Sequence, residues 1–249
     1  NNMGQLDGKT AIVTGGGTGI GKGIARAFAN EGCNVVIASR SADALGQAAK
    51  DLGQIGPDIV PIPTDVTNEA QVASLFNQTM SQFGRLDVLV NNSGAFDGGP
   101  IDTLTLEAWD KVISTNVTGP FLCSREAFRI MKKSGGGRII NIGSISAQMP
   151  RQDSAPYSTS KFALTGLTKS IALDGREFGI ACSILHPGNT AVERRSDSRS
   201  GAGRDMGPEV LIETGDMART ALLMATMPPD TNLFEAIVLP VQQPYLGRG

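Results

Sequence analysis

Tyr157 and Lys161 are the two residues of this sequence whose types and spacing point most directly to chemistry. They stand four positions apart in a segment of helical pattern, and that spacing places both side chains on one face of a helix. A free tyrosine has a pKa of about 10 and is a weak base at neutral pH, but a neighbouring ammonium lowers that pKa. Such a pair is suited to proton exchange with a secondary alcohol. Ser144 follows an apolar run and is expected nearby, at a strand end.

A glycine-rich turn near the start of the chain is the second chemical signal. It directly follows the apolar run 10–14, and a helical pattern begins within it near residue 19. A strand, a glycine turn and a helix start together present backbone N–H groups to a pyrophosphate, and glycine lets the backbone approach without a Cβ. We therefore expect a dinucleotide-binding loop made of Gly15, Gly17, Thr18, Gly19, Ile20 and Gly21.

The end of the next apolar run, 34–39, indicates which dinucleotide binds. A fold that selects NAD usually carries a carboxylate about 20 residues beyond the glycines, on the ribose 2′-hydroxyl. This run ends in Ser39 and Arg40 instead, and arginine binds a phosphate in bidentate fashion. The sequence therefore favours NADP(H) over NAD(H). In the alternative, Arg40 lies in a surface loop and Asp43 serves NAD.

Short apolar runs alternate with segments of helical period along the chain, as in a parallel sheet covered on both faces. The expected strands are Thr10–Thr14, Asn34–Ser39, Ile59–Thr64, Leu86–Asn91, Arg138–Ile142, Ile180–His186 and Phe234–Leu239. The expected helices lie near 19–31, 41–53, 68–83, 105–133, 155–178 and 208–226. This pattern predicts an α/β fold, a single Rossmann-type, doubly wound parallel sheet of seven strands with helices on both faces. One NAD(P)-binding domain is expected over 3–249, with Asn1 and Asn2 an extraneous remnant.

Composition argues against several classes of protein. The formal net charge of the 249 residues is −2, which disfavours a nucleic-acid-binding surface across the chain. No apolar run approaches the roughly 18 residues of a membrane span, and the polar start lacks a signal-peptide core. Three widely spaced cysteines form no disulfide or metal pattern, so we expect them in the core and the protein in the reducing cytoplasm. The single His186 is expected to be structural, and no metal site is predicted.

Taken in order, these motifs resemble the short-chain dehydrogenase/reductase family over nearly the whole chain, and its 3-oxoacyl-carrier-protein reductase-like branch in particular. Thr14-Gly15-x-x-x-Gly19-x-Gly21 is similar to the family's cofactor loop, and Asn91-Asn92-Ser93-Gly94 to its NNAG element. Asp65 matches the acidic residue that contacts the adenine, and Pro187-Gly188 the element after the sixth strand. The family's catalytic set is matched in order by Asn116, Ser144, Tyr157 and Lys161.

The resemblance implies a role for each matched residue. Tyr157 would be the acid/base, Lys161 would favour its phenolate and bind the nicotinamide ribose, and Ser144 would orient the substrate oxygen. Tyr157 and Lys161 would share the cofactor with Ser39, Arg40, Asp65, Val66, Asn92, Ser93, Gly94, Pro187, Gly188 and Thr190. Thr190 stands in for a threonine that many relatives carry at the position of Val192.

Asn116 would hold a water in a proton relay, and the sequence supports this independently. The residue falls within an apolar helical stripe, where a polar amide must be hydrogen-bonded. Because Pro120 has no N–H, the Asn116 carbonyl lacks its usual partner four residues on and is open to a water. A simple helix kink is the other interpretation, and the two are compatible.

The function these features predict is an NADP-dependent oxidoreductase that moves a hydride between the nicotinamide and a carbonyl or secondary alcohol of a small molecule. The alternatives are a 3-oxoacyl-thioester reductase with an acidic acyl-carrier partner facing Arg194, Arg195 and Arg199, a sugar or steroid reductase, and a non-catalytic NADP-sensing regulator. The segment 188–207 is either a substrate lid or a solvated loop. The tail 239–249 is expected to pack on a neighbouring subunit of a homo-oligomer, a tetramer or dimer.

Overall fold

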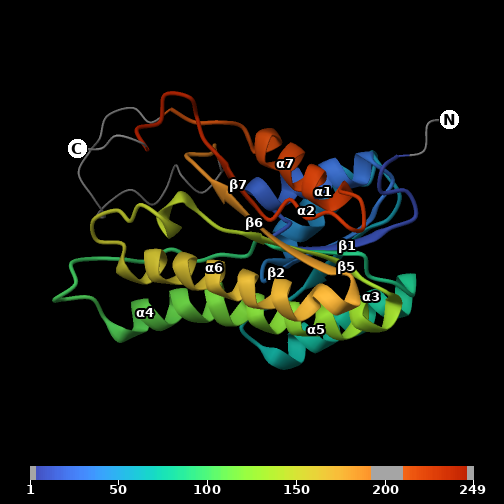
Figure 1. Cartoon of the computed structure of the whole chain (residues 1–249), viewed down its shortest axis with the longest axis horizontal. Helices are drawn as coiled ribbons and strands as arrows, with labels where there is room; N and C mark the ends of the chain where they lie inside the picture. Colours follow the sequence, from blue (N-terminus) through green and yellow to red (C-terminus); the bar gives the residue numbers. More distant parts are fainter. Residues whose placement is uncertain (1–3, 192–209, 246–249) are drawn as a thin grey trace.

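The computed structural model describes residues 4–191 and 210–245, which build one seven-stranded parallel sheet with helices around it (Figure 1). The strands are β1 (Thr10–Thr14), β2 (Asn34–Ser39), β3 (Ile59–Pro63), β4 (Val88–Asn91), β5 (Gly137–Ile142), β6 (Ile180–Pro187) and β7 (Glu235–Val238). The helices are α1 (Gly19–Asn30), α2 (Ala42–Leu52), α3 (Glu69–Phe83), α4 (Leu106–Ile113), α5 (Gly119–Ser134), α6 (Ala155–Gly175) and α7 (Thr214–Thr226). The predicted fold class is confirmed.

The strand order makes the sheet doubly wound. It runs β3-β2-β1-β4-β5-β6-β7, and every neighbouring pair is parallel. The chain therefore starts in the middle, builds outward to β3, and returns to the other side of β1 to begin β4. Loops that leave β1 and β4 turn to opposite faces, and such a reversal point is where ligands bind in open α/β sheets.

Side chains of each strand alternate between two cores, one on each face of the sheet. Ala11 and Val13 of β1 pack in a core with α1, α2 and α7, whereas Ile12 between them packs in a core with α3, α5 and α6. In Figure 1, α1, α2 and α7 lie on one side of the strands and α3, α5 and α6 on the other. Burial on both faces explains why these strands are near-continuous apolar runs.

The predicted elements differ from the structure mainly in three helices. The expected helix 105–133 was wrong as a single α-helix, because a π-helical segment, Ser114–Thr118, separates α4 from α5. The expected helix 208–226 begins only at Thr214 within the described residues, and the expected helix 155–178 ends in a 3-10 turn at 176–178. Strand ends shift by one or two residues, as with β4, which starts at Val88 instead of Leu86.

All three cysteines are buried and free, as predicted for small core residues. Burial raises the pKa of the Cys33 thiol to about 12, and does the same for Cys123, so these side chains behave as hydrophobes. Within the two described stretches, no helix is long and apolar enough to cross a membrane. The same stretches hold no cluster of three His, Cys, Asp or Glu residues able to bind a metal ion.

A buried polar network joins the central strands to two helices. Asn91 Nδ2 at the end of β4 donates to Asn141 Oδ1 of β5 at 2.8 Å and to Ser124 Oγ of α5 at 3.0 Å. Asn141 Nδ2 in turn donates to Thr168 Oγ1 of α6 at 2.8 Å. All four side chains are buried. These bonds between buried groups fix how α5 and α6 sit on the sheet, although Asn91 Oδ1 itself has no hydrogen-bond partner.

We expect Asn141→Ala to lower the free energy of unfolding by about 2–3 kcal/mol, because it leaves the Asn91 amide without one acceptor and opens a small cavity. Urea denaturation followed by circular dichroism measures the change. Asn77→Ala, on the exposed face of α3, is the matched control and should change stability by less than about 0.5 kcal/mol. Equal effects of the two substitutions would contradict a structural role for the network.

Candidate active site

The predicted site residues gather at the carboxyl edge of the sheet. β1 ends at Thr14 and leads into the glycine turn, β4 ends at Asn91 before Asn92, and β5 ends just before Ser144. Pro187 closes β6 at the same edge. Because parallel strands end together, residues as far apart in the sequence as Thr14 and Pro187 are brought to one edge of the sheet, where the binding crevice lies in this fold class.

The glycine turn adopts the conformation that its composition predicts. Gly15 and Gly19 have φ of +64° and +53°, a region that side-chain-bearing residues rarely adopt. A Cβ on Gly21 would lie 2.3 Å from the Gly15 carbonyl oxygen, whereas one on Gly17 would meet no atom closer than 3.4 Å. Thr18 precedes α1 in extended conformation and does not cap it with its side chain, so the first N–H groups of α1 receive no acceptor from Thr18 and can bind an anion.

Thr14 ties the glycine turn to the loop after β4, a role that its motif position alone did not reveal. Its Oγ1 accepts from the backbone N–H groups of Asn92 and Ser93, both at 3.0 Å. The Asn92 Nδ2 donates back to the Thr14 and Gly15 carbonyls at 3.1 and 3.2 Å. Gly94 follows with room around it, since a Cβ there would lie 3.6 Å from Asn116 Oδ1. Two loops of the crevice are thus fastened together.

The structure brings Ser39, Arg40 and Asp65 together at the ends of β2 and β3. Thr64 N–H donates to the Ser39 carbonyl at 2.9 Å, which places Asp65 beside Arg40. Burial acts to raise the pKa of the Asp65 carboxyl, but hydrogen bonds from Thr67 and the charge of Arg40 outweigh it and leave this pKa below its usual range. Asp65 is therefore ionised at neutral pH. Val66 next to it is buried against Gly119.

Asn116 lies in the π-helical segment and is almost fully buried. Its Oδ1 accepts from Ala95 N–H at 2.7 Å, and its Nδ2 donates to the Ala95 carbonyl at 2.9 Å and to Ser160 Oγ at 3.0 Å. The amide thus holds the loop after β4 against α6. The group of Asn116 that we expect to bind a water is its backbone carbonyl, because Pro120 deprives this carbonyl of an α-helical partner.

Lys161 and Tyr157 share one face of α6, as their spacing predicts. The Lys161 ammonium is buried, donates to the Ile142 carbonyl at 2.9 Å and lies 5.6 Å from the centre of the Tyr157 ring. The exposed Phe96 meets that ring edge-on at 5.2 Å between centroids. An ammonium donates three hydrogen bonds, so two remain for groups in the crevice.

Ser144 is held by its backbone, and its hydroxyl lies at the start of a 3-10 turn. Ser144 Oγ accepts from Ser146 N–H at 3.1 Å. The backbone N–H of Ser144 donates to the His186 Nδ1 at 3.2 Å. The sequence offered no signal for this contact, because the two residues are 42 positions apart.

The element after β6 is described only in part. Gly188 N–H donates to the Val238 carbonyl at 2.8 Å, and the buried Thr190 donates from its hydroxyl to the Gly188 carbonyl at 3.1 Å. Val192 and the rest of the predicted segment up to 207 lie outside the described residues. The same holds for Arg194, Arg195 and Arg199.

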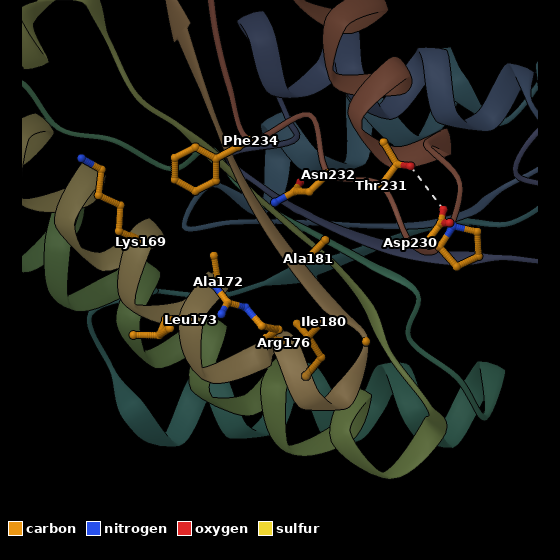
Figure 2. A pocket seen from close by; sticks show the side chains of 12 residues that line it. Lys169, Ala172, Leu173, Arg176, Ile180, Ala181, Asp230, Thr231, Asn232 and Phe234 are labelled. Carbon is orange, nitrogen blue, oxygen red and sulfur yellow. Dashed lines mark hydrogen bonds between the residues drawn. The ribbon is translucent and has the colours of Figure 1, made fainter.

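A cavity of the described part of the chain lies away from this site. It measures about 620 Å³ and is open at the amino end of β6. Figure 2 shows Lys169, Leu173 and Arg176 on one side of it, and Asp230, Thr231 and Phe234 on the other. A smaller hollow of about 290 Å³ lies between the loop at 99–101 and the start of α6. Only the smaller hollow adjoins Tyr157 along the chain.

Comparisons with known proteins agree with this geometry. The family model described as short chain dehydrogenase matches residues 9–203. An uncharacterized oxidoreductase of Bacillus subtilis is 41% identical over 180 residues, 72% of this chain and 70% of the relative. Glucose 1-dehydrogenase 2 of the same organism is 38% identical over 205 residues, 80% of this chain and 79% of the relative. The crystal structure of a metagenomic short-chain oxidoreductase in complex with NADP is similar with a TM-score of 0.82 and 31% identity, covering 95% of this chain and 98% of that one.

The family match and the geometry fall on the same part of the chain. The matched range begins just before β1 and includes β1 to β6. It therefore contains the glycine turn as well as Asn116, Ser144, Tyr157 and Lys161. This chain belongs to the short-chain dehydrogenase/reductase family and is an oxidoreductase of that family.

Proposed function

We propose that this enzyme uses NADP(H) to interconvert a carbonyl and a secondary alcohol on a small molecule. The observation that carries the proposal is the buried Lys161 ammonium between the Ile142 carbonyl and the Tyr157 ring, at the sheet edge that also holds Ser144 and Asn116. A cation placed there stabilises the negative charge that develops on the Tyr157 oxygen as a proton leaves it. That arrangement serves proton transfer to or from a substrate oxygen.

The crevice fits a dinucleotide. Without a Cβ, Gly15 and Gly21 let Asn92 Nδ2 pack against the turn, since a Cβ would lie 2.7 and 2.4 Å from it. The first N–H groups of α1, which Thr18 does not cap with its side chain, follow this turn and suit a phosphate. When bound, the nicotinamide cofactor supplies or accepts the hydride. The residues that would hold it are the glycine turn, Asp65 and Val66 near the adenine, Asn92 to Gly94, and Pro187, Gly188 and Thr190.

Each catalytic side chain then has one task. Tyr157 gives its hydroxyl proton to the oxygen of a carbonyl substrate during reduction, or takes one from an alcohol during oxidation. Lys161 stabilises the phenolate and, with its remaining N–H groups, binds the nicotinamide ribose. Ser144 holds the substrate oxygen in place, and a water on the Asn116 carbonyl returns the proton from solvent.

Arg40 and Ser39 are the residues we assign to NADP selection. Arg40 is exposed beside Asp65 at the end of β2, where a 2′-phosphate would extend, and no carboxylate ends this strand. A guanidinium pairs well with such a phosphate. The complex of the metagenomic relative with NADP supports this choice.

For the substrate we propose a ketone or secondary alcohol with an apolar group that contacts Phe96, because Phe96 is exposed and packs on the Tyr157 ring. The name of the glucose dehydrogenase relative is consistent with an alcohol substrate. We also propose that the chain acts as one domain in a cytoplasmic homo-oligomer. A 3-oxoacyl thioester on an acidic carrier is the competing substrate, and a direct comparison with simple ketones decides between them.

Replacing Tyr157 by phenylalanine should lower kcat by at least about a hundredfold while changing the NADPH Kd by less than about threefold, since only the proton-carrying hydroxyl is lost. Steady-state NADPH oxidation with a ketone substrate and fluorescence titration of NADPH measure the two quantities. Thr159→Ala removes an exposed hydroxyl from the same turn of α6 and should keep activity within about twofold of the parent. Full activity in the phenylalanine variant would rule out Tyr157 as the acid. If the unsubstituted protein, the parent chain, shows no turnover, the alternative of a non-catalytic NADP-sensing regulator is favoured.

Arg40→Ala should weaken NADPH binding by about tenfold or more and leave NADH binding within about twofold, because only NADPH carries the 2′-phosphate. Isothermal titration of both cofactors gives the ratio of their Kd values. Arg26→Ala, which removes an exposed arginine from α1, is the control for a general loss of positive charge. Tighter binding of NADH than of NADPH by the parent chain would refute the assignment.

A further inference from the structure

We propose that His186 is a positioning residue for Ser144, holding the backbone of the catalytic serine through Nδ1 while Glu235 orients the imidazole from the other side. This inference rests on the proposed function, since it assigns His186 a part in the same reaction. His186 does not touch the crevice itself. It acts through the serine whose position it sets.

The imidazole is packed directly beneath the serine. His186 has no exposed surface, and its Nδ1 lies 3.2 Å from the Ser144 nitrogen and 2.9 Å from the Ser144 carbonyl oxygen. A Cβ on Gly143 would lie 2.5 Å from this Nδ1. Glycine before the serine is therefore what lets the ring approach so closely, an instance of glycine serving a close contact.

The carboxylate of Glu235 selects the tautomer of the ring. His186 Nε2 lies 3.1 Å from Glu235 Oε1, at ion-pair distance although not aligned as a hydrogen bond. A proton on Nε2 faces that carboxylate, and the Nδ1 lone pair then accepts from the Ser144 N–H. The opposite tautomer would donate from Nδ1 to the Ser144 carbonyl at 2.9 Å, but it would set the Nε2 lone pair against the charged Glu235 carboxylate. Because the carboxylate carries the full negative charge, it outweighs the neutral carbonyl and favours the proton on Nε2.

A neutral ring is the form that this environment favours. Burial lowers the pKa of His186 below its usual value, and the charge of Lys161 on α6 acts in the same direction. The Ser144 carbonyl, to which a protonated ring would donate, and Glu235 on β7 both act to raise this pKa, without reversing the shift. At neutral pH the imidazole is therefore an acceptor at Nδ1 and a donor at Nε2.

The contacts of His186 and Glu235 form a closed ring of interactions that begins and ends in the segment of Ser144. Glu235 Oε1 accepts from Gln148 Nε2 at 3.3 Å, and Gln148 follows Ser144 by one turn of backbone. The path from Ser144 through His186 and Glu235 thus returns to the segment where it began. Tyr245 of the tail adds a hydrogen bond to Gln148 Oε1. Such a closed set of contacts holds Ser144 where a single one would let it shift.

His186→Leu should lower kcat by about tenfold or more while leaving the NADPH Kd within about twofold, because leucine fills the space but cannot accept from the Ser144 N–H. His186→Asn places an amide oxygen near the position of Nδ1 and should restore most of the lost kcat. A leucine variant as active as the parent, or an asparagine variant no better than leucine, would overturn the proposal.

A double-mutant cycle separates positioning from general stability. In a Ser144→Ala background, His186→Leu should reduce kcat by no more than about twofold further, because the group that it positions is already gone. A full additional loss in that background would mean that His186 acts elsewhere.

If the parent chain shows no turnover with any carbonyl, the proposed function fails. An active parent with an unaffected leucine variant overturns only the inference about His186.

The tautomer can be measured without any activity. His186 is the one histidine of the sequence, so the imidazole ¹⁵N signals of the parent chain report this ring alone. We expect the neutral Nε2–H tautomer at pH 7 and a midpoint below 6.5 on acidification. Because the folded ring binds its proton more weakly than a free histidine, stability should be complete above about pH 6.5 and fall as the pH drops through this midpoint. A neutral Nδ1–H signal, or a charged ring at pH 7, would overturn the assigned contact.

Discussion

The parallel direction of all seven strands is the constraint on which the rest of this structure depends. Because every strand points the same way, all carboxyl ends meet at one edge, and the chain must return across a face of the sheet between strands. The direction in which strands are added to the sheet reverses between β1 and β4, so the loops that follow these two strands turn to opposite faces. Thr14 and Asn92 then join those loops by four hydrogen bonds. The site is thus a consequence of topology, closed by a few polar contacts.

The polar groups at this edge are held mainly by backbone atoms of distant segments. Lys161 of α6 donates to the Ile142 carbonyl of β5, and Asn116 pairs with both backbone groups of Ala95. His186 of β6 bonds the backbone of Ser144 in the same way. Burying such groups is favourable only when each has a partner. The requirement for partners fixes where the catalytic side chains lie, while the two apolar cores on the faces of the sheet supply the stability.

Local patterns predicted much of the fold and of the candidate site. The glycine turn was predictable because the positive φ of Gly15 and the crowding at Gly21 admit no side chain, a demand that acts on the sequence directly. The break in the predicted helix 105–133 was missed, although Pro120 signalled a disturbed carbonyl at Asn116. The missing N–H of a proline predicts where an α-helical hydrogen bond is lost, but it does not predict that the backbone adopts a π-helical segment there.

The sequence by itself determined the succession of strands and helices along the chain, the dinucleotide turn, and the placement of Tyr157 and Lys161 on one helix face. Each of these features follows from a periodic pattern or from steric contact between residues that are close in the sequence. Only the tertiary structure decided which distant partner each buried polar group meets. The bond between Ser144 and His186 spans 42 positions, and that between Gln148 and Tyr245 spans 97. Hydrogen bonds leave no periodic mark on a sequence, because any donor can meet any acceptor that the packing of the sheet brings within reach.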